Sequence, residues 1–219
     1  MKRIAIQLVF GALLAFTTCT TRGNIENTST NVLSEEQAAN LDTAYFASGC
    51  FWCTEAVFER VKGVYDVVSG YTGGKKPNPN YREVSAGLTE HAEAVRVAYD
   101  PDQVDYQTLV EIFFGSHDPT TLNRQGPDVG KQYRSAIFYA SDEEKATAAQ
   151  IKRRLDSERV FSDPIVTEIT AFSIFWDAED YHQNYYELNP YQPYIVSVSK
   201  PKVEKFMKQF KDKLKEEYK

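Results

Sequence analysis

Between residues 43 and 218 the spacing of the apolar residues switches repeatedly between two periods, and this alternation constrains the fold more than any other feature. Residues 92–99 alternate as a strand does, whereas the apolar residues of 106–114 recur on one helical face. Such a mixture predicts an α+β fold, an α/β sandwich, rather than a helical bundle or a barrel. We expect strands at residues 43–48, 64–68, 92–99 and 135–140, one or two strands within 165–176, helices at 50–61, 106–114, 141–159 and 200–218, and turn-rich loops at 70–79 and 118–133.

The first 42 residues differ in character from the rest and are predicted to direct export. A short basic start precedes an apolar run at residues 4–16, which is too short for a bilayer span but suits a signal-peptide core. Small residues then precede Cys19, an arrangement that resembles the lipobox of bacterial lipoproteins. The alternative is a buried N-terminal helix. We expect a signal peptide at 1–18, a lipidated Cys19, a flexible tether at 19–42 and a domain with a C-terminal helix at 43–219, exported to the periplasm-facing cell envelope of a bacterium.

The charge and the cysteine count exclude several classes of protein. The chain carries 25 Lys and Arg against 31 Asp and Glu, a net charge of −6, so it lacks the basic excess of a nucleic-acid binder. Three cysteines are too few for a disulfide scaffold. A zinc site would require four ligands, usually from a second cysteine pair, so we expect no metal and no organic cofactor.

Two of the cysteines belong to the segment Gly49-Cys50-Phe51-Trp52-Cys53, at the point where a predicted strand meets a predicted helix. A cysteine at a helix N-terminus faces unpaired N–H groups and the positive end of the dipole, so we expect a lowered pKa for Cys50 and a nucleophilic thiolate. Cys53 lies three residues further, on the same helix face, within reach of a disulfide. A redox pair, a thioredoxin-like dithiol and a structural disulfide all remain open at this point.

Further motifs follow the cysteine segment in a fixed order along residues 43–210. They are Gly70-Tyr71-Thr72-Gly73-Gly74, Asn78-Pro79-Asn80-Tyr81, His91-Ala92-Glu93-Ala94-Val95, His117-Asp118-Pro119-Thr120, Arg124-Gln125-Gly126 with Asp128, Gln132-Tyr133-Arg134-Ser135, and Ala178-Glu179-Asp180-Tyr181-His182-Gln183. Together with Gly-Cys-Phe-Trp, this series resembles the A-type family of peptide methionine sulfoxide reductases. The resemblance implies a mixed sheet with a ferredoxin-like core packed against helices, and reduction of the S-epimer of methionine sulfoxide, free or within proteins.

The resemblance also implies how the reaction divides between two residues. Cys50 would attack the sulfoxide sulfur and become a sulfenic acid as methionine leaves. Glu93 would donate the proton that the departing oxygen needs. The strand pattern is consistent with this role, because it buries Glu93, and burial raises a carboxyl pKa. Taken alone, Glu93 could equally form a salt bridge.

Five other residues match the substrate pocket of the family. Tyr81 and Tyr133 correspond to two phenols that hold the sulfoxide oxygen, and Asp128 corresponds to their polar partner. Phe51 and Trp52 correspond to an aromatic cage for the substrate methyl group, which suits the affinity of sulfur for ring surfaces. Ordinary core packing is the alternative for each of these rings. Among the three histidines, His182 is predicted to line the rear of the site.

The sequence departs from the family pattern in ways that bear on recycling. Cys53 stands where many members have glycine, and no cysteine follows it. We infer that Cys53 attacks the Cys50 sulfenic acid, closing a disulfide that an external thioredoxin-like protein reduces. Glu90 replaces a usual glycine and adds a negative charge near the site.

We expect the protein to be a monomer. Two other functions compete with the reductase: a general thiol–disulfide oxidoreductase and a non-enzymatic binding module.

Overall fold

The computed structural model describes residues 39–219. The predicted signal peptide, Cys19 and nearly all of the predicted tether lie outside the described residues.

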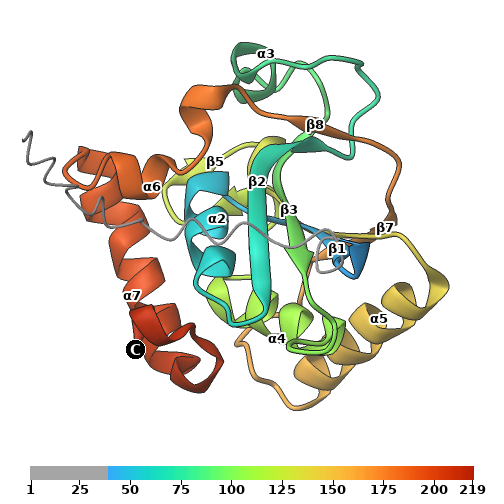
Figure 1. The fold of residues 1–219 in the computed structure, drawn as a ribbon. Helices are drawn as coiled ribbons and strands as arrows, with labels where there is room; N and C mark the ends of the chain where they lie inside the picture. The colour runs from blue at the N-terminus through green and yellow to red at the C-terminus, as the bar shows by residue number, and fades with distance from the viewer. Residues whose placement is uncertain (1–38) are drawn as a thin grey trace, which may run out of the picture. The chain divides into compact units, whose positions relative to one another are not determined.

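A six-stranded mixed sheet forms the centre of the described part (Figure 1). Its strands, in spatial order, are β7 (Glu168–Ala171), β6 (Ser135–Tyr139), β1 (Asp42–Ser48), β3 (Ala92–Tyr99), β2 (Val64–Thr72) and β8 (Phe175–Asp177). Only β6 and β7 pair in parallel; the other neighbours are antiparallel. The four inner strands with their two crossover helices have the β-α-β-β-α-β order of a ferredoxin-like core, which confirms the predicted fold.

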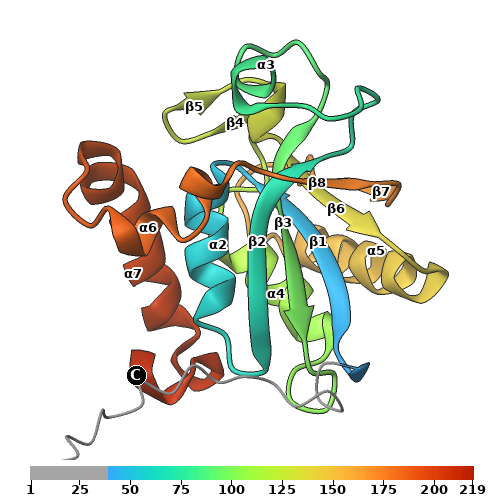
Figure 2. The ribbon, with the colours of Figure 1, turned by 45° about the horizontal axis from the view of Figure 1, so that its top comes forward.

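The main helices are α2 (Phe51–Glu59), α4 (Tyr106–Ser116), α5 (Asp142–Ser157) and α7 (Lys200–Gln209), with short helices α3 (Tyr81–Ser85) and α6 (Tyr185–Leu188). The long helices pack on one face of the sheet, and α7 lies against α2 (Figure 2). The large core lies between these two layers and contains Phe46, Phe58 and Phe113, whose rings stack. A smaller apolar cluster of alanines and Phe138 covers the opposite face.

The alternation of β3 decides which of its side chains face the helices. Val95 and Val97 belong to the core beneath the helices, while Ala92 and Ala94 belong to the cluster on the other face. Because side chains two apart in a strand point the same way, Glu93 shares the helix-covered face with Val95. The strand therefore delivers a carboxyl group beneath the N-terminus of α2.

Three elements differ from the sequence prediction. Residues 70–72 continue β2 instead of forming a turn, because they pair with β8 on one side and with β3 on the other. The predicted loop 118–133 contains a small hairpin, β4 (Arg124–Gln125) with β5 (Asp128–Val129). The last helix is shorter than predicted and ends at Gln209, after which the chain turns so that the buried Leu214 can bridge to Val61.

Within residues 39–219, none of the helices combines the length and the apolar character that a membrane span requires.

Candidate active site

A strand-to-helix turn presents Cys50. β1 ends at Ser48, and Gly49 adopts a left-handed φ of +92° that residues with a Cβ rarely take. The side chain of Gln125 packs so closely on Gly49 that a Cβ there would lie 2.6 Å from it. Cys50 is the N-cap of α2, and its carbonyl accepts the Cys53 N–H at 3.1 Å. The backbone geometry thus places Cys50 at the positive end of the helix, as predicted.

Glu93 lies at the same helix N-terminus. Its side chain is 2% exposed, and Oε2 accepts the backbone N–H of Phe51 at 3.1 Å. Burial raises the pKa of Glu93 to about 8, against the lowering effect of the hydrogen bond from Phe51, while the negative charges of Asp128 and Cys53 raise the pKa further. Glu93 is therefore a neutral, proton-bearing acid at pH 7, consistent with the burial that the strand pattern predicts.

Cys50 and Cys53 are both buried and unoxidised, and each thiol shifts the pKa of the other. Burial raises the pKa of Cys50 well above its ordinary value, and the negative charges of Cys53 and Glu93 raise it further. The neighbouring Cys50 side chain lowers the pKa of Cys53 to about 7, against the effect of burial, and a contact of 3.1 Å with Ser199 Oγ helps to lower it. The predicted lowering of the Cys50 pKa is therefore wrong for the reduced form of this pair. Desolvation outweighs the helix dipole at Cys50, and Cys53 is the more acidic thiol of the pair.

Polar groups from distant segments converge around this pair. Tyr81 begins α3, Tyr133 ends a 3₁₀ turn, and Asp128 lies in β5. The phenols are protonated: burial raises the pKa of Tyr81 to about 12, with contributions from Glu93 and Cys50, and it raises the pKa of Tyr133 as well, again with a contribution from Glu93. The structure therefore brings both predicted phenols and the predicted Asp128 into the electrostatic surroundings of Cys50 and Glu93.

An aromatic wall flanks the thiols. Trp52 stacks on Tyr185 with 3.9 Å between ring centroids, and its indole N–H donates to His182 Nδ1 at 3.2 Å. Phe51 is almost fully buried, with its ring 4.9 Å from that of His182. Trp52 keeps part of its ring accessible, whereas Phe51 supports the wall from within the core. His182 contacts Phe51, Trp52 and Tyr81 and lies behind the site, where the sequence predicts it.

Comparisons with known proteins agree with this arrangement. Residues 42–214 match the family described as peptide methionine sulfoxide reductase. The chain is 53% identical over 185 residues to the peptide methionine sulfoxide reductase MsrA of Deinococcus radiodurans, covering 84% of this chain and 90% of that protein. It is 50% identical over 188 residues to the MsrA of Ralstonia nicotianae, covering 84% of this chain and 97% of the relative. The chain belongs to the peptide methionine sulfoxide reductase family.

Solved structures support the same assignment of this reductase. Reduced Mxr1 from Saccharomyces cerevisiae superposes with a TM-score of 0.64 at 38% identity, covering 70% of this chain and 88% of Mxr1. Methionine sulfoxide reductase A of Corynebacterium diphtheriae gives a TM-score of 0.63 at 37% identity, covering 70% and 78% of the two chains.

The structure adds site residues of this reductase that the sequence did not single out. Tyr194 donates to Asp128 Oδ2 at 2.5 Å, and its hydroxyl group acts to lower the pKa of the Cys50 thiol. Glu179 accepts the backbone N–H of Tyr81 at 2.9 Å and so anchors the start of α3. Tyr194 follows a segment punctuated by Pro190 and Pro193, and this aromatic, proline-bounded segment was the only local signal for it.

Glu90, which the sequence marks as an unusual negative charge, is exposed at the surface. It adopts a left-handed φ of +60°, where a glycine would be unstrained. Its carboxylate pairs with Lys131 Nζ at 2.9 Å on the exposed surface. The ion pair neutralises the added charge locally.

Among the described residues there is no group of three or more His, Cys, Asp or Glu that could hold a metal ion.

Proposed function

We propose that this peptide methionine sulfoxide reductase uses Cys50 as its nucleophile and Glu93 as its acid. The enzyme is an oxidoreductase that reduces methionine sulfoxide to methionine at the expense of thiols, as its family membership establishes. The observation that carries the assignment of roles is the position of Glu93: a buried, protonated carboxyl group hydrogen-bonded to Phe51, the residue that directly follows Cys50. A disulfide exchange enzyme would need no such acid.

The first step removes oxygen from the substrate. Cys50 Sγ attacks the electrophilic sulfoxide sulfur, and the oxygen takes the proton of Glu93. The Glu93 carboxylate recovers a proton from the Cys50 thiol, so the acid is regenerated. The hydroxyl group then passes from the substrate sulfur to Cys50 Sγ as the bond between the two sulfurs breaks, so methionine leaves and Cys50 is a sulfenic acid. This relay suits a site in which the free-enzyme forms of Cys50 and Glu93 are both protonated.

The second step restores a form that can be recycled. The Cys53 thiolate attacks Cys50 Sγ, an S–S bond forms as the S–O bond breaks, and the oxygen leaves as water after taking a proton. The pKa of about 7 for Cys53 supports its role as the attacking sulfur. Residues 39–219 contain no third cysteine, so we assign reduction of the disulfide to an external dithiol protein of thioredoxin type.

The pocket would select the substrate by two of its groups, the sulfoxide oxygen and the methyl group on the sulfur. The hydroxyl groups of Tyr81 and Tyr133 would donate to the sulfoxide oxygen, and Asp128 would orient the pocket through Tyr194. The accessible ring surface of Trp52 would receive the methyl group. We assign the S-epimer as substrate, free or protein-bound.

We further propose that the enzyme acts as a monomer in the cell envelope, held by a lipid on Cys19. The support is the order of a basic start, a short apolar run and small residues before Cys19.

An epimer-resolved assay of two cysteine variants tests the division of labour. Reduced wild-type enzyme without recycling reductant should convert one equivalent of S-sulfoxide and form a Cys50–Cys53 disulfide, visible by peptide mass mapping. Cys50→Ser should convert none. Cys53→Ser should convert one equivalent and then retain a trappable sulfenic acid on Cys50.

Two outcomes would contradict the proposal. Equal multiple turnover by both variants, in the presence of a thioredoxin-like reductant, would show that Cys50 is not the nucleophile. Efficient reduction of disulfides in a model protein, with no loss in Glu93→Gln, would instead favour the general thiol–disulfide oxidoreductase.

A further inference from the structure

Lys202, in the first turn of α7, carries a charge that nothing in the proposed reaction uses. Its Nζ atom is buried and has no hydrogen-bond partner among the described residues. No carboxylate of residues 39–219 forms an ion pair with it either. A desolvated ammonium without a partner is costly to the folded state, so a compensating negative group is expected nearby.

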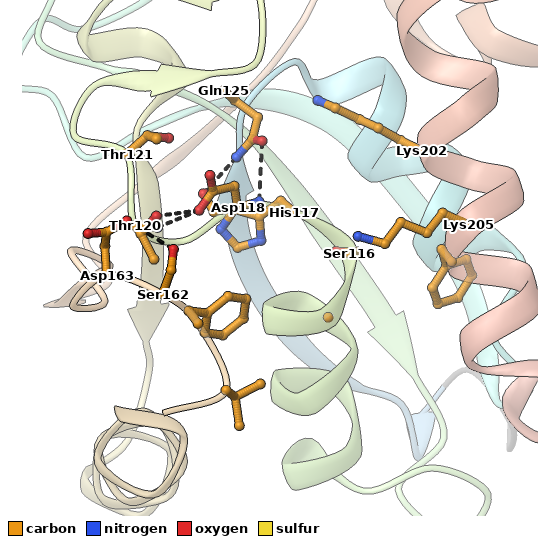
Figure 3. Close-up of a pocket in the computed structure, with 14 residues that line it drawn as sticks. Ser116, His117, Asp118, Thr120, Thr121, Gln125, Ser162, Asp163, Lys202 and Lys205 are labelled. Atoms are coloured by element: carbon orange, nitrogen blue, oxygen red, sulfur yellow. Dashed lines mark hydrogen bonds between the residues drawn. The ribbon is translucent and has the colours of Figure 1, made fainter. Parts of the chain in front are cut away.

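The geometry of α7 directs this ammonium toward the thiols. Ser199, which precedes the first residue of α7, contacts Cys53 Sγ at 3.1 Å. Lys202 lies three residues later, on the same face of the helix. Figure 3 shows its side chain extending from α7 toward Gln125, and Gln125 packs on Gly49, directly before Cys50. The ammonium is therefore aimed at the junction from which both thiols project.

Lys202 differs in charge from the other ionisable side chains that act on Cys53. The ionisable neighbours of Cys53 are Cys50 on the same helix, Glu93 on β3, Asp128 on β5, Tyr186 on α6, Tyr194 before α7 and Lys202 on α7. Of these, Lys202 is the one cation; the rest are neutral or negative at pH 7. Its charge acts on Cys53 in the direction that favours the thiolate.

Lys202 also lines a pocket, but an anion bound in this pocket does not explain the position of its ammonium group. This pocket has a volume of about 520 Å³ and is also lined by Lys205, Asp118 and Asp163 (Figure 3). Two lysines and two aspartates balance, so the pocket has no net charge with which to select an anion. His117, which also lines it, is neutral because burial lowers its pKa to about 4.

We propose that Lys202 is a positioning residue for the resolving step, whose buried ammonium holds Cys53 as a thiolate aimed at the sulfenic sulfur of Cys50. This inference rests on the proposed role of Cys53. Lys202 itself gains and loses nothing: the S–S bond forms, the S–O bond breaks, and the oxygen leaves as water, while the ammonium keeps its proton throughout.

A single-turnover experiment on the full chain separates the two chemical steps. Reduced Lys202→Met, Lys202→Arg and Lys205→Met are each mixed with one equivalent of methionine S-sulfoxide. Methionine release reports the Cys50 step, and the loss of sulfenic acid, by trapping and mass analysis, reports disulfide closure. Lys205→Met is the matched control, because Lys205 is an exposed lysine on the same helix and lines the same pocket.

Lys202→Met should release methionine within about twofold of the wild-type rate, yet close the disulfide about fivefold more slowly at pH 7, because a rise of the Cys53 pKa from about 7 to about 8 lowers the thiolate fraction from about one half to about one tenth. The pH midpoint of closure should move upward. Lys202→Arg should recover most of the closure rate, and Lys205→Met should match the wild type. If Lys202→Met melts early, Lys202→Gln replaces it, since it keeps a polar end.

Unchanged closure and an unchanged midpoint in the Lys202 variants would overturn the inference. Slowing of methionine release and of closure by the same factor would overturn it too, because that pattern indicates general damage. If wild-type enzyme itself released no methionine, the proposed function would fail; a normal wild-type burst without a Lys202 effect would remove only the inference.

Discussion

At the scale of single residues, the site depends on burial more than on local dipoles. Glu93 is a carboxyl group that burial keeps protonated, and Cys50 is a thiol that burial and negative neighbours keep protonated. Cys53 is the more acidic thiol of the pair, because the neighbouring Cys50 side chain lowers its pKa to about 7. The same residue types on an exposed helix end would have the opposite charges.

Glu93→Gln should lower kcat/KM by about 10²–10⁴-fold, since the amide keeps the shape of the side chain but has no proton to transfer. In the wild type, the acid form is needed and the pKa is about 8, so activity should fall as the pH rises through 8. That alkaline fall should disappear in the variant. Steady-state kinetics from pH 6 to pH 9.5 measure both effects.

Glu90→Gln is the control for this series. Its carboxylate is exposed and paired with Lys131 at the surface, so its activity profile should follow the wild type. A Glu93→Gln enzyme with the wild-type rate and profile would remove Glu93 from the reaction.

Glu55 on α2 should make stability depend on pH. Its side chain is buried, Oε1 accepts the N–H of Asn184 at 3.1 Å, and burial raises the pKa to about 8. The fold favours the neutral acid, so this contribution is complete below the ordinary pKa of 4.5 and is lost as the pH rises through 8. The stability advantage of Glu55→Gln over the wild type should therefore be larger at pH 9 than at pH 5, by on the order of 4 kcal/mol of unfolding free energy.

Urea denaturation at pH 5, 7 and 9 tests this effect. Glu59 and Glu93 also have raised pKa values, so the loss at high pH should shrink in the variant without vanishing. Parallel pH curves for the two proteins would show that Glu55 is ionised in the folded state.

At the scale of elements, the junction of β1 and α2 is a place where the backbone conformation and the packing together restrict the side chain that can be present. Gly49 must take a positive φ while the Gln125 side chain from the β4–β5 hairpin packs on it. The junction fixes the direction of α2, and α2 carries both thiols and the N–H that binds Glu93. A small change at this junction should therefore alter the positions of both thiols and of the N–H that binds Glu93.

Gly49→Ala should cost about 2–4 kcal/mol, combining left-handed strain with overpacking, and should lower turnover, because the new methyl group displaces Gln125 or rotates α2. Gly87→Ala is the matched control. Gly87 also has a positive φ, +71°, but a Cβ there meets nothing within 4 Å. It should cost about 1–2 kcal/mol from strain alone. Chemical denaturation and turnover measure both; equal costs would show that Gln125 moves aside freely.

At the scale of the whole molecule, the site is assembled from segments far apart in the chain. α2 supplies the thiols, β3 the acid, α3 one phenol, the β4–β5 hairpin Asp128, and the segment before α7 Tyr194. The sheet brings the first two together, and long-range hydrogen bonds such as that from Tyr81 N to Glu179 hold the others.

The predicted leader is tested on the full chain in a bacterial cell. The expected result is membrane association, with a labelled lipid on Cys19 and loss of residues 1–18 from the mature mass. Cys19→Ala should take up no label and should leave the membrane fraction after washing, with its sulfoxide reductase activity intact. A soluble wild-type product of full-length mass would contradict both export and lipidation.

The sequence alone determined those features that depend on local patterns. The strand at 92–99 was predicted to the residue, because alternation is a property of neighbouring side chains, and the same alternation correctly buried Glu93. The ordered motifs identified the family, and the strand–glycine–helix pattern placed Cys50 at a helix N-terminus.

Only the tertiary structure decided what depends on distant partners. Residues 70–72 are strand because residues 175–177 pair with them, which no local pattern at 70–72 reveals. Cys50 is protonated because burial beneath distant segments and the neighbouring Cys53 raise the pKa of its thiol. Ser199 contacts Cys53 Sγ because α7 packs on α2. Electrostatic free energies in a buried site are sums over such neighbours, and the chain order does not specify them.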